Sequence, residues 1–171
     1  QWAADLGLDI KEDKVGNLII KKPATEGMEN KKGVILQAHM DMVPQKNADN
    51  DHDFLTDPIE AFIVNENGDD WVTAKGTTLG ADNGIGLASA LAVLASDDIA
   101  HGPLEVLVTI DEEAGMSGAF GLKSNWLKGE ILINTDSEQE GEVYMGCAGG
   151  IDGTATFDLE YDNVPENYQA F

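Results

Sequence analysis

The sequence predicts an α/β fold: a mixed, largely parallel sheet flanked by helices. Short apolar runs rich in β-branched residues alternate with helical segments along the chain, which is typical of this class. With 171 residues, 42% of them hydrophobic and 25% charged, the chain has the size and composition of one folded domain. These observations exclude wholesale disorder and fibrous repeats.

The first half of the chain predicts strands. Residues 18–20 and 33–38 are apolar runs bounded by polar or turn residues, as in strands covered on both faces. Residues 23–32 between them carry Pro, Gly, Asn and mixed charge, which indicates a surface loop. Residues 62–64 and 71–74 flank an Asn-Gly pair, which favours the turn of a β-hairpin.

The second half continues the alternation. Residues 85–95 are apolar almost all round and predict a buried helix that begins at a glycine-rich turn. Residues 104–110 and 131–134 predict two further buried strands, with a helix expected within 118–127. Residues 154–161 alternate with period two, which predicts a strand with one solvated face.

Charge and hydrophobicity exclude several classes of function. Ten Lys plus Arg against 32 Asp plus Glu give a formal net charge of −22, which repels nucleic acid and anionic membrane surfaces. No apolar run approaches the roughly 18 residues that a membrane span needs, and the first residues do not resemble a signal peptide. The single Cys147 cannot form an internal disulfide, so we expect a cytoplasmic protein.

Four polar clusters lie where predicted strands end or where the predicted helix begins. His39 and Asp41 follow one strand and project to the same side of an extended chain. An acid lies among glycines in residues 80–86, and residues 111–115 and 134–138 follow two more strands. Taken singly, each cluster also fits a structural role: a hydrogen-bonded histidine, a helix cap or solvated strand ends.

Together the clusters indicate a metal site, because ligand sites lie at the carboxyl ends of strands in α/β sheets. Several carboxylates at one sheet edge would repel one another unless a cation lies among them. His, Asp and Glu suit zinc, and a carboxylate can bridge two metal ions about 3.5–4 Å apart. Because Glu112 and Glu113 are adjacent, one can bind metal while the other addresses a water, as metal-assisted hydrolysis requires.

The order of these motifs resembles that of the di-zinc metallopeptidases, a family of carboxypeptidases, dipeptidases and deacetylases. Three longer strings, residues 39–45, 76–82 and 145–150, resemble the aminoacyl-histidine dipeptidase branch. The resemblance covers nearly the whole chain. It implies metal-dependent hydrolysis of unblocked dipeptides, especially Xaa-His dipeptides such as carnosine.

The resemblance also implies a ligand set for two Zn²⁺ ions, for which Co²⁺ or Mn²⁺ could substitute. His39 and Asp136 would bind one ion and Glu113 the other. Asp82 would bridge both, and a cis peptide bond would follow it. The resemblance therefore assigns four metal ligands to this chain.

Two further residues receive catalytic roles from the resemblance. Asp41 would orient the imidazole of His39. Glu112 would be the general base that takes a proton from water and later passes it to the leaving amine.

Parts of the family pattern are missing from the sequence. The family's second zinc takes a histidine near the end of a longer chain, and neither His52 nor His101 is a convincing replacement. The lid domain, through which the family forms homodimers, is also absent. We therefore expect residues 1–171 to be the N-terminal segment of a longer parent, a partial catalytic domain that is nearly inactive alone.

Alternative functions fit the sequence less well. A related tripeptidase or deacylase of the same family is the main alternative, since the chain contains little of the specificity surface. Residues 49–60 place acids at positions 1, 3, 5 and 12 of a calcium loop, which would make the chain a non-catalytic cation-binding module. Phe54 in place of Gly and Pro58 within the loop disfavour that interpretation.

Overall fold

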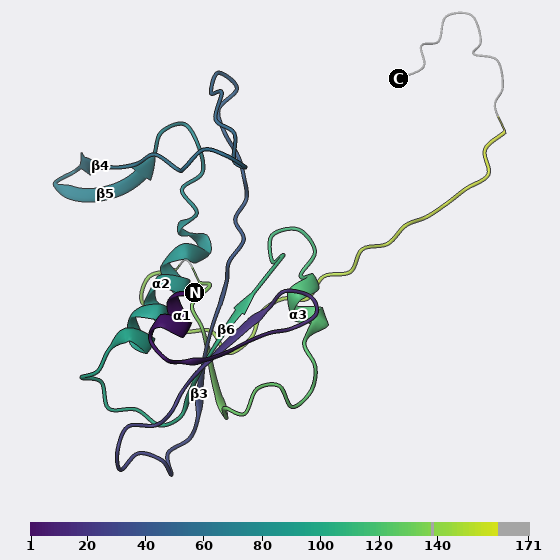
Figure 1. Cartoon of the computed structure of the whole chain (residues 1–171). Coiled ribbons are helices and arrows are strands. Elements are labelled where there is room, and N and C mark those ends of the chain that lie inside the picture. The colour runs from purple at the N-terminus through teal and green to yellow at the C-terminus, as the bar shows by residue number, and fades with distance from the viewer. Residues whose placement is uncertain (138, 161–171) are drawn as a thin grey trace, which may run out of the picture. The chain divides into compact units, whose positions relative to one another are not determined.

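The computed structural model describes residues 1–137 and 139–160 and divides the chain into two compact units, residues 1–138 and 139–171. All helices and strands of the described residues lie in the first unit (Figure 1). They are α1 (Trp2–Asp5), β1 (Asp9–Glu12), β2 (Leu18–Lys22), β3 (Val34–His39), β4 (Ala61–Glu66), β5 (Asp69–Ala74), α2 (Ala81–Ala95), β6 (Leu104–Thr109), α3 (Ser117–Gly121) and β7 (Ile131–Asn134).

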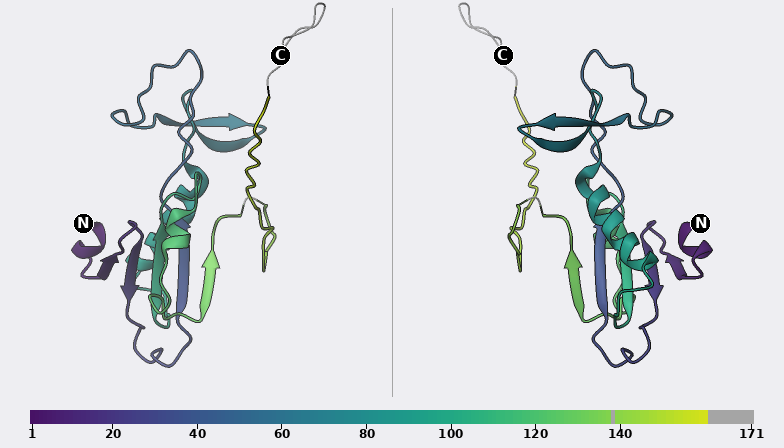
Figure 2. Two further views of the ribbon diagram at one scale, coloured as in Figure 1. Left: turned by 90° about the vertical axis from the view of Figure 1, so that its right-hand side faces the viewer. Right: turned by 90° about the vertical axis from the view of Figure 1, so that its left-hand side faces the viewer.

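The described strands form a five-stranded sheet in the order β1-β2-β6-β3-β7, seen side by side in Figure 2. β3 is parallel to both of its neighbours, with Val34 opposite Leu104 of β6 and Ile131 of β7. β2 is antiparallel to both of its neighbours, β1 and β6. The predicted mixed α/β sheet is confirmed. Its three parallel strands end at the same edge, so the loops that follow them meet there.

One face of the sheet packs against α2. Residues of α2 spaced by four, Ala90 and Leu94 among them, are buried against Ile20, Val106 and Val108 of the sheet. The small side chains on this helix face allow a close approach between helix and sheet, and burying the apolar stripe stabilises the contact by roughly 25 cal/mol per Å².

The opposite face carries a second, smaller core. Ile19, Ile35 and Leu107 are buried there beneath Leu122 and Trp126, which belong to the segment after α3. Figure 1 shows α2 and α3 on opposite sides of β3 and β6. The sheet is thus covered on both faces near its centre.

Burial falls short of the sequence prediction at two elements. The helix α2 was expected to be buried all round, but only one stripe is covered, and Ile85 is 68% exposed. β7 was expected to be buried, but Ile131, Leu132 and Ile133 are exposed. The physical reason is that, in the described part of the chain, β7 pairs with β3 alone and α2 contacts the sheet on one side alone.

The strand predicted for residues 154–161 was wrong where it can be compared. Residues 154–160 have no regular secondary structure, and Tyr161 lies outside the described residues. An alternating pattern forms a strand only when a partner strand takes its hydrogen bonds, and residues 154–160 have none among the described residues. Conversely, β1 (Asp9–Glu12) was not predicted, because its four exposed residues carry no apolar run.

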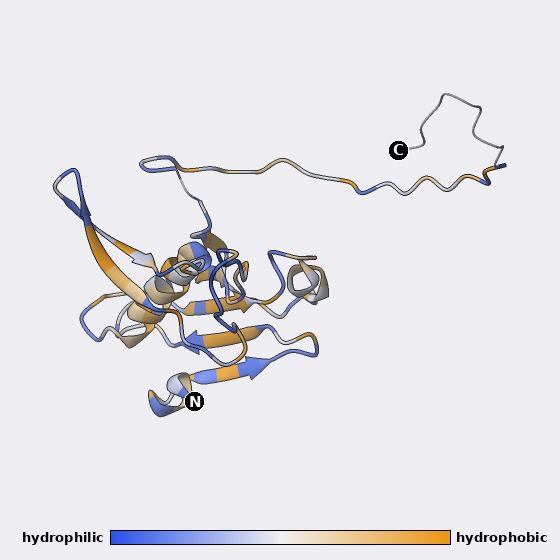
Figure 3. Ribbon diagram, turned by 90° about the horizontal axis from the view of Figure 1, so that it is seen from above, coloured by the Kyte–Doolittle hydropathy of each residue, from blue (hydrophilic) through white to orange (hydrophobic). Residues whose placement is uncertain are grey.

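The predicted hairpin is confirmed in β4 and β5. Asn67 and Gly68 have φ values of 57° and 94°, the positive angles of a two-residue hairpin turn. Val64 pairs with Trp71 across the hairpin, and Figure 3 shows a hydrophobic stretch in it. Among the described residues, none of the helices has the length and hydrophobicity to cross a bilayer.

Candidate metal centre

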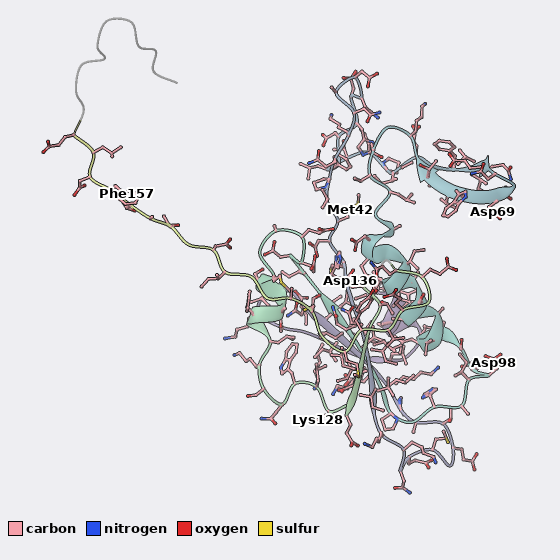
Figure 4. The ribbon with its side chains drawn as sticks, turned by 180° about the vertical axis from the view of Figure 1, so that it is seen from behind. Met42, Asp69, Asp98, Lys128, Asp136 and Phe157 are labelled. Carbon is pink, nitrogen blue, oxygen red and sulfur yellow. The ribbon has the colours of Figure 1, made fainter. Side chains whose placement is uncertain are left out.

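The four polar clusters predicted from the sequence converge at the carboxyl edge of the parallel strands. His39 is the last residue of β3, and residues 111–113 begin two residues after the end of β6. Asp136 lies two residues after β7, and Asp82 lies in the first turn of α2. Figure 4 labels Asp136 at this edge of the sheet.

The imidazole of His39 lies at the centre of the cluster and is only 1% exposed. Its Nδ1 is 2.9 Å from the backbone carbonyl oxygen of Asp41. Because a carbonyl can only accept, Nδ1 is the donor, and Nε2 is the atom that faces the carboxylates. This fixed tautomer is the one that histidine ligands of metal ions commonly have.

Three carboxylates surround Nε2 of His39. The nearest atoms are Oδ1 of Asp82 at 3.0 Å, Oδ2 of Asp136 at 3.7 Å and Oε2 of Glu112 at 4.0 Å. His39 belongs to two groups of three potential metal ligands. One group adds Asp82 and Glu113, and the other adds Glu112 and Asp136. Within each group the ligand atoms lie within 4.8 Å of one another. The chemistry of this donor set, one imidazole nitrogen among carboxylate oxygens, fits divalent zinc, cobalt or manganese.

Asp82 is oriented by an irregular start to α2. Gly80 adopts the left-handed conformation with φ of 78°, and the φ and ψ angles of Asp82 and Asn83 are not helical. The peptide bond between Asp82 and Asn83 is cis, as the family resemblance implies. Asp82 does not act as the helix cap considered from the sequence, since the cap position is Gly80. Its carboxylate faces His39 instead.

Asp41 connects the two sides of the cluster. Its Oδ1 lies 3.5 Å from Nδ1 of His39, and its Oδ2 accepts a hydrogen bond of 3.1 Å from the backbone N–H of Glu113. Burial would raise the pKa of Asp41, but the backbone N–H groups of Glu113 and Glu112 outweigh it and lower that pKa. Asp41 therefore remains ionised beside the imidazole.

The crowding of carboxylates perturbs the ionisation of the cluster. Burial, together with the hydrogen bond and charge of Asp82 and the charge of Glu112, raises the pKa of Asp136 to about 6. Burial opposes the charged form of His39, but the hydrogen bond to Asp82 and the charge of Asp136 raise its pKa above 6.5. A bound cation would relieve the repulsion that produces both shifts.

Two side chains that neighbour metal-site acids in the sequence lie close to Gly86 of α2. A Cβ at Gly86 would lie 1.9 Å from Oδ1 of Asn83 and 2.1 Å from Oγ1 of Thr135, so only glycine fits there. Asn83 and Thr135 adjoin Asp82 and Asp136 in the chain. Neither residue was predicted to have a role, because a neutral polar residue beside an acid carries no signal of its own.

A cavity of about 210 Å³ opens beside the cluster. Its lining includes Glu112 and Asp136 at one end, the polar side chains of Gln37 and Thr109, and the apolar Met116 and Leu132. The amide of Asn134 hydrogen-bonds to Gln37, which in turn donates to Oγ1 of Thr109 at 3.2 Å. A small molecule entering this cavity would meet both the carboxylates and an apolar wall.

Two larger cavities lie away from the cluster. One, of about 540 Å³, is lined by Lys21, Glu105 and Lys128 at the opposite, amino edge of the parallel strands; Figure 4 labels Lys128 there. The other, of about 740 Å³, lies among residues 47–77. Neither contains a residue of the candidate metal centre, so size is no guide to the site in this chain.

The remaining histidines and the calcium-loop acids do not join a metal cluster in the described part of the chain. His101 is buried three residues before β6, and its Nδ1 lies 2.7 Å from the carbonyl oxygen of Gly102. Asp53 accepts a hydrogen bond from the N–H of Leu55, as in an ordinary turn. The only clusters found among the described residues contain His39. The calcium-loop alternative gains no support.

Comparison with known proteins identifies relatives over nearly the whole chain. The model of peptidase family M20/M25/M40 matches residues 35–160. The chain is 62% identical over 170 residues to the cytosol non-specific dipeptidase of Escherichia coli (strain K12), covering 99% of this chain and 34% of that protein.

Solved structures give the same result. The crystal structure of aminoacylhistidine dipeptidase from Vibrio alginolyticus matches with 73% identity and a TM-score of 0.81, over 85% of this chain and 29% of that one. A tripeptidase from Staphylococcus aureus subsp. aureus mu50 matches with 27% identity and a TM-score of 0.60, over 80% of this chain and 36% of that one. The chain spans about a third of the length of these relatives.

Proposed function

This chain belongs to peptidase family M20/M25/M40, and on that basis we propose that it forms the metal-binding part of a dipeptidase catalytic domain. The observation that carries the proposal is the convergence of His39 with Asp82, Glu113 and Asp136 at one sheet edge. The family implies a metal cofactor. We propose that the cofactor is a pair of Zn²⁺ ions, with Co²⁺ or Mn²⁺ as substitutes.

We propose the ligand roles that the family resemblance implies, and the proximity of these donor atoms supports them. His39 Nε2 and a carboxylate oxygen of Asp136 would hold one ion, and Glu113 would hold the other. Asp82, whose carboxylate has two oxygens, would bridge them. The raised pKa of Asp136, caused by burial and by Asp82 and Glu112, supports a cation at this position.

The chemistry needs a proton acceptor beside the ions. When bound, the ions polarise the scissile carbonyl and make a water more acidic. Glu112, whose side chain is 35% exposed, can accept the proton from that water and donate it to the amine that leaves. Asp41 keeps His39 in the tautomer that leaves Nε2 free for metal, through the carbonyl contact at its Nδ1.

The proposed substrates are unblocked dipeptides, Xaa-His dipeptides such as carnosine among them. The names of the two relatives support this class, since one is a non-specific dipeptidase and the other an aminoacylhistidine dipeptidase. The first relative is a cytosol protein, which supports a cytoplasmic location.

We further propose that residues 1–171 act within a longer protein, which supplies the histidine for the second ion and dimerises through a lid domain. The support is that the relatives are about three times as long as the matched segment. Alone, the 171-residue chain would then hydrolyse carnosine far more slowly than the longer protein.

The test compares Glu112→Gln with Glu113→Gln in the full-length protein. Its substrates are carnosine, an N-blocked dipeptide and a tripeptide, assayed with and without a chelator. We expect hydrolysis of the free dipeptide that the chelator abolishes. Glu112→Gln would keep its metal content and lose at least 10²-fold in kcat, whereas Glu113→Gln would lose metal. A metal-loaded protein that hydrolyses no dipeptide would overturn the proposal.

A tripeptidase is the second candidate, and two weaker structural matches support it. The Staphylococcus aureus relative is a tripeptidase, and an aminopeptidase PepT from Bacillus cereus ATCC 10987 matches with 30% identity and a TM-score of 0.60. Both identities are well below the 73% of the dipeptidase structure. A higher kcat/KM for tripeptides than for dipeptides in the same assay would select this alternative.

A further inference from the structure

We propose that Asn17 is a positioning residue, which holds the loop that carries Glu112 and Glu113. We call residues 110–118, which run from the end of β6 into the first residues of α3, the acidic loop. The inference rests on the proposed function, because it concerns how this chain presents two residues of the candidate metal centre. Asn17 lies immediately before β2, far from that centre in the sequence.

The side chain of Asn17 contacts both ends of the acidic loop. It is completely buried, with 0% of its surface exposed. Its Nδ2 donates to the backbone carbonyl of Gly118 at 2.8 Å, and its Oδ1 accepts from the backbone N–H of Ile110 at 3.3 Å. One amide group therefore closes the loop, because it satisfies a donor at the start and an acceptor at the end.

Asp13 fixes the orientation of that amide. Its Oδ1 accepts the backbone N–H groups of Val15, Gly16 and Asn17, and its Oδ2 accepts Nδ2 of Asn17 at 2.8 Å. Because both hydrogens of Nδ2 are engaged, the oxygen must face Ile110. The turn between β1 and β2 is thus built to aim one side chain at the acidic loop.

The acidic loop leaves no room for a side chain where Gly118 lies beside Asn17. A Cβ on Gly118 would lie 2.4 Å from the carbonyl oxygen of Ile110 and 2.6 Å from Oδ1 of Asn17. Glycine at this position is therefore required for the contact. Asp111 and Met116 adopt positive φ angles of 58° and 53°, which few non-glycine residues do, so the loop needs external support.

The acidic loop is consequently held from two directions. On the side of the metal centre, the N–H of Glu113 donates to Asp41. On the far side, Asn17 holds Ile110 and Gly118. Releasing the far side would let the two glutamates move relative to His39, although no contact of theirs is removed.

The experiment measures metal binding and fold stability together. Zn²⁺ affinity is determined by calorimetry, and the Co²⁺ complex by its visible absorption, for the full-length protein and its Asn17→Ala variant. The matched control is Leu94→Ala, which truncates a side chain that is 2% exposed at the far end of α2. Urea denaturation of both variants gives the loss of stability for comparison.

We expect Asn17→Ala to weaken Zn²⁺ binding about 10- to 100-fold and to change the Co²⁺ spectrum. Amide exchange in residues 111–117 should accelerate as well. Leu94→Ala should lose comparable stability with an affinity within twofold of the unaltered chain. If Asn17→Ala does not fold, Asn17→Ser serves in its place, since one hydroxyl cannot reach both Ile110 and Gly118.

Each other outcome separates the two proposals. If the unaltered chain binds Zn²⁺ and the Asn17 variant binds it equally well with unchanged loop exchange, Asn17 is not a positioning residue and the metal centre stands. If Leu94→Ala weakens binding as much as Asn17→Ala, the effect is one of stability, and the inference is overturned. If the unaltered chain binds neither ion, the metal centre and the role of Asn17 both fall.

Discussion

The carboxylate of Asp41 accepts a hydrogen bond of 3.1 Å from the backbone N–H of Glu113, while the carbonyl of the same aspartate lies 2.9 Å from Nδ1 of His39. One residue thereby couples the loop after β3 to the loop after β6. The backbone carbonyl of Asp41 positions the imidazole of His39, and the carboxylate of Asp41 positions Glu113.

Substitution of Asp41 tests this coupling. We expect Asp41→Ala to weaken Zn²⁺ binding about 10- to 100-fold, because the carboxylate 3.5 Å from Nδ1 of His39 and the anchor of Glu113 are both lost, while the carbonyl contact to Nδ1 remains. Asp41→Asn, which retains an oxygen acceptor without the charge, should lie between that variant and the unaltered chain. Calorimetric titration with Zn²⁺ provides the measurement, and equal affinities for all three chains would contradict the expectation.

The metal-free chain should lose stability as pH rises through the neutral range. Folding raises the pKa of Asp136 from 3.8 to about 6, mainly through burial and Asp82. The pKa of His39 rises above 6.5, because Asp82 and Asp136 outweigh the opposing effect of burial. Groups with raised pKa values stabilise the fold fully below their unfolded pKa, and that contribution is lost as pH rises through the folded value.

Urea denaturation of the chelator-treated chain between pH 4 and pH 8 measures this effect. Other groups titrate too, so the informative quantity is the difference between the unaltered chain and Asp136→Asn. That difference should change between pH 4 and about pH 6, the window set by the two pKa values of Asp136. A difference that is constant with pH would show that Asp136 titrates normally.

Gly86 should tolerate no side chain, whereas its neighbour Gly84 should. A Cβ at Gly86 would overlap Asn83 and Thr135, which adjoin Asp82 and Asp136 in the chain, whereas a Cβ at Gly84 meets nothing within 4 Å. We expect Gly86→Ala to lower the free energy of unfolding by about 1–3 kcal/mol and to weaken metal binding.

Gly84→Ala is the matched control in the same helix. It should be neutral or stabilise the chain by up to about 1 kcal/mol, because alanine favours the helix more than glycine does. Thermal unfolding of the two variants makes the comparison. Similar melting temperatures for both would mean that the contact at Gly86 is not tight in solution.

The ion pair between Lys21 and Glu105 should contribute to stability above acidic pH. Glu105 is 5% exposed, and its carboxylate also accepts the N–H groups of Lys128 and Gly129 at 2.6 and 2.7 Å. Burial would raise its pKa, but Lys21 and the two N–H groups lower it. The stability from a lowered pKa is present above the unfolded value of 4.5 and is lost as pH falls.

Glu105→Gln should therefore destabilise the chain by about 1–3 kcal/mol at pH 7 and by less at pH 4. Glu130→Gln is the control, since Glu130 pairs with Lys32 at 3.5 Å where both side chains are largely exposed, and such pairs contribute little. Urea denaturation at both pH values measures the difference. Equal losses of stability for Glu105→Gln and Glu130→Gln would contradict the larger contribution that we expect from the buried ion pair.

The sequence predicted correctly those strands and turns that residues adjacent in the chain encode. The runs that became β2, β3 and β6 were apolar and β-branched, and Asn67-Gly68 carried the turn signal of the hairpin. The convergence of His39 with the distant acids was also predictable, because parallel strands end at a common edge and each acid follows a strand or begins a helix.

Burial and strand pairing that depend on segments distant in the chain could not be predicted from local sequence patterns. The apolar residues of β7 and the outer face of α2 look like core in the sequence, but burial requires a neighbour that a local pattern does not show. Residues 154–160 failed as a strand for the same reason. Asn17 was missed because Gly-Asn is an ordinary turn signal, and its contact with Gly118 lies 101 residues away.

The weak anchoring of β7 links metal binding to the local opening of the sheet. In the part of the chain that the structure describes, this four-residue strand pairs on one side only, and Asp136 follows it by two residues. Edge strands of this kind open more readily than the rest of a fold. An ion that binds Asp136 only while β7 is paired would suppress that opening by a free energy of RT ln(1 + [M]/Kd). The cation would then stabilise the pairing of β7 with β3, in addition to any part it takes in catalysis.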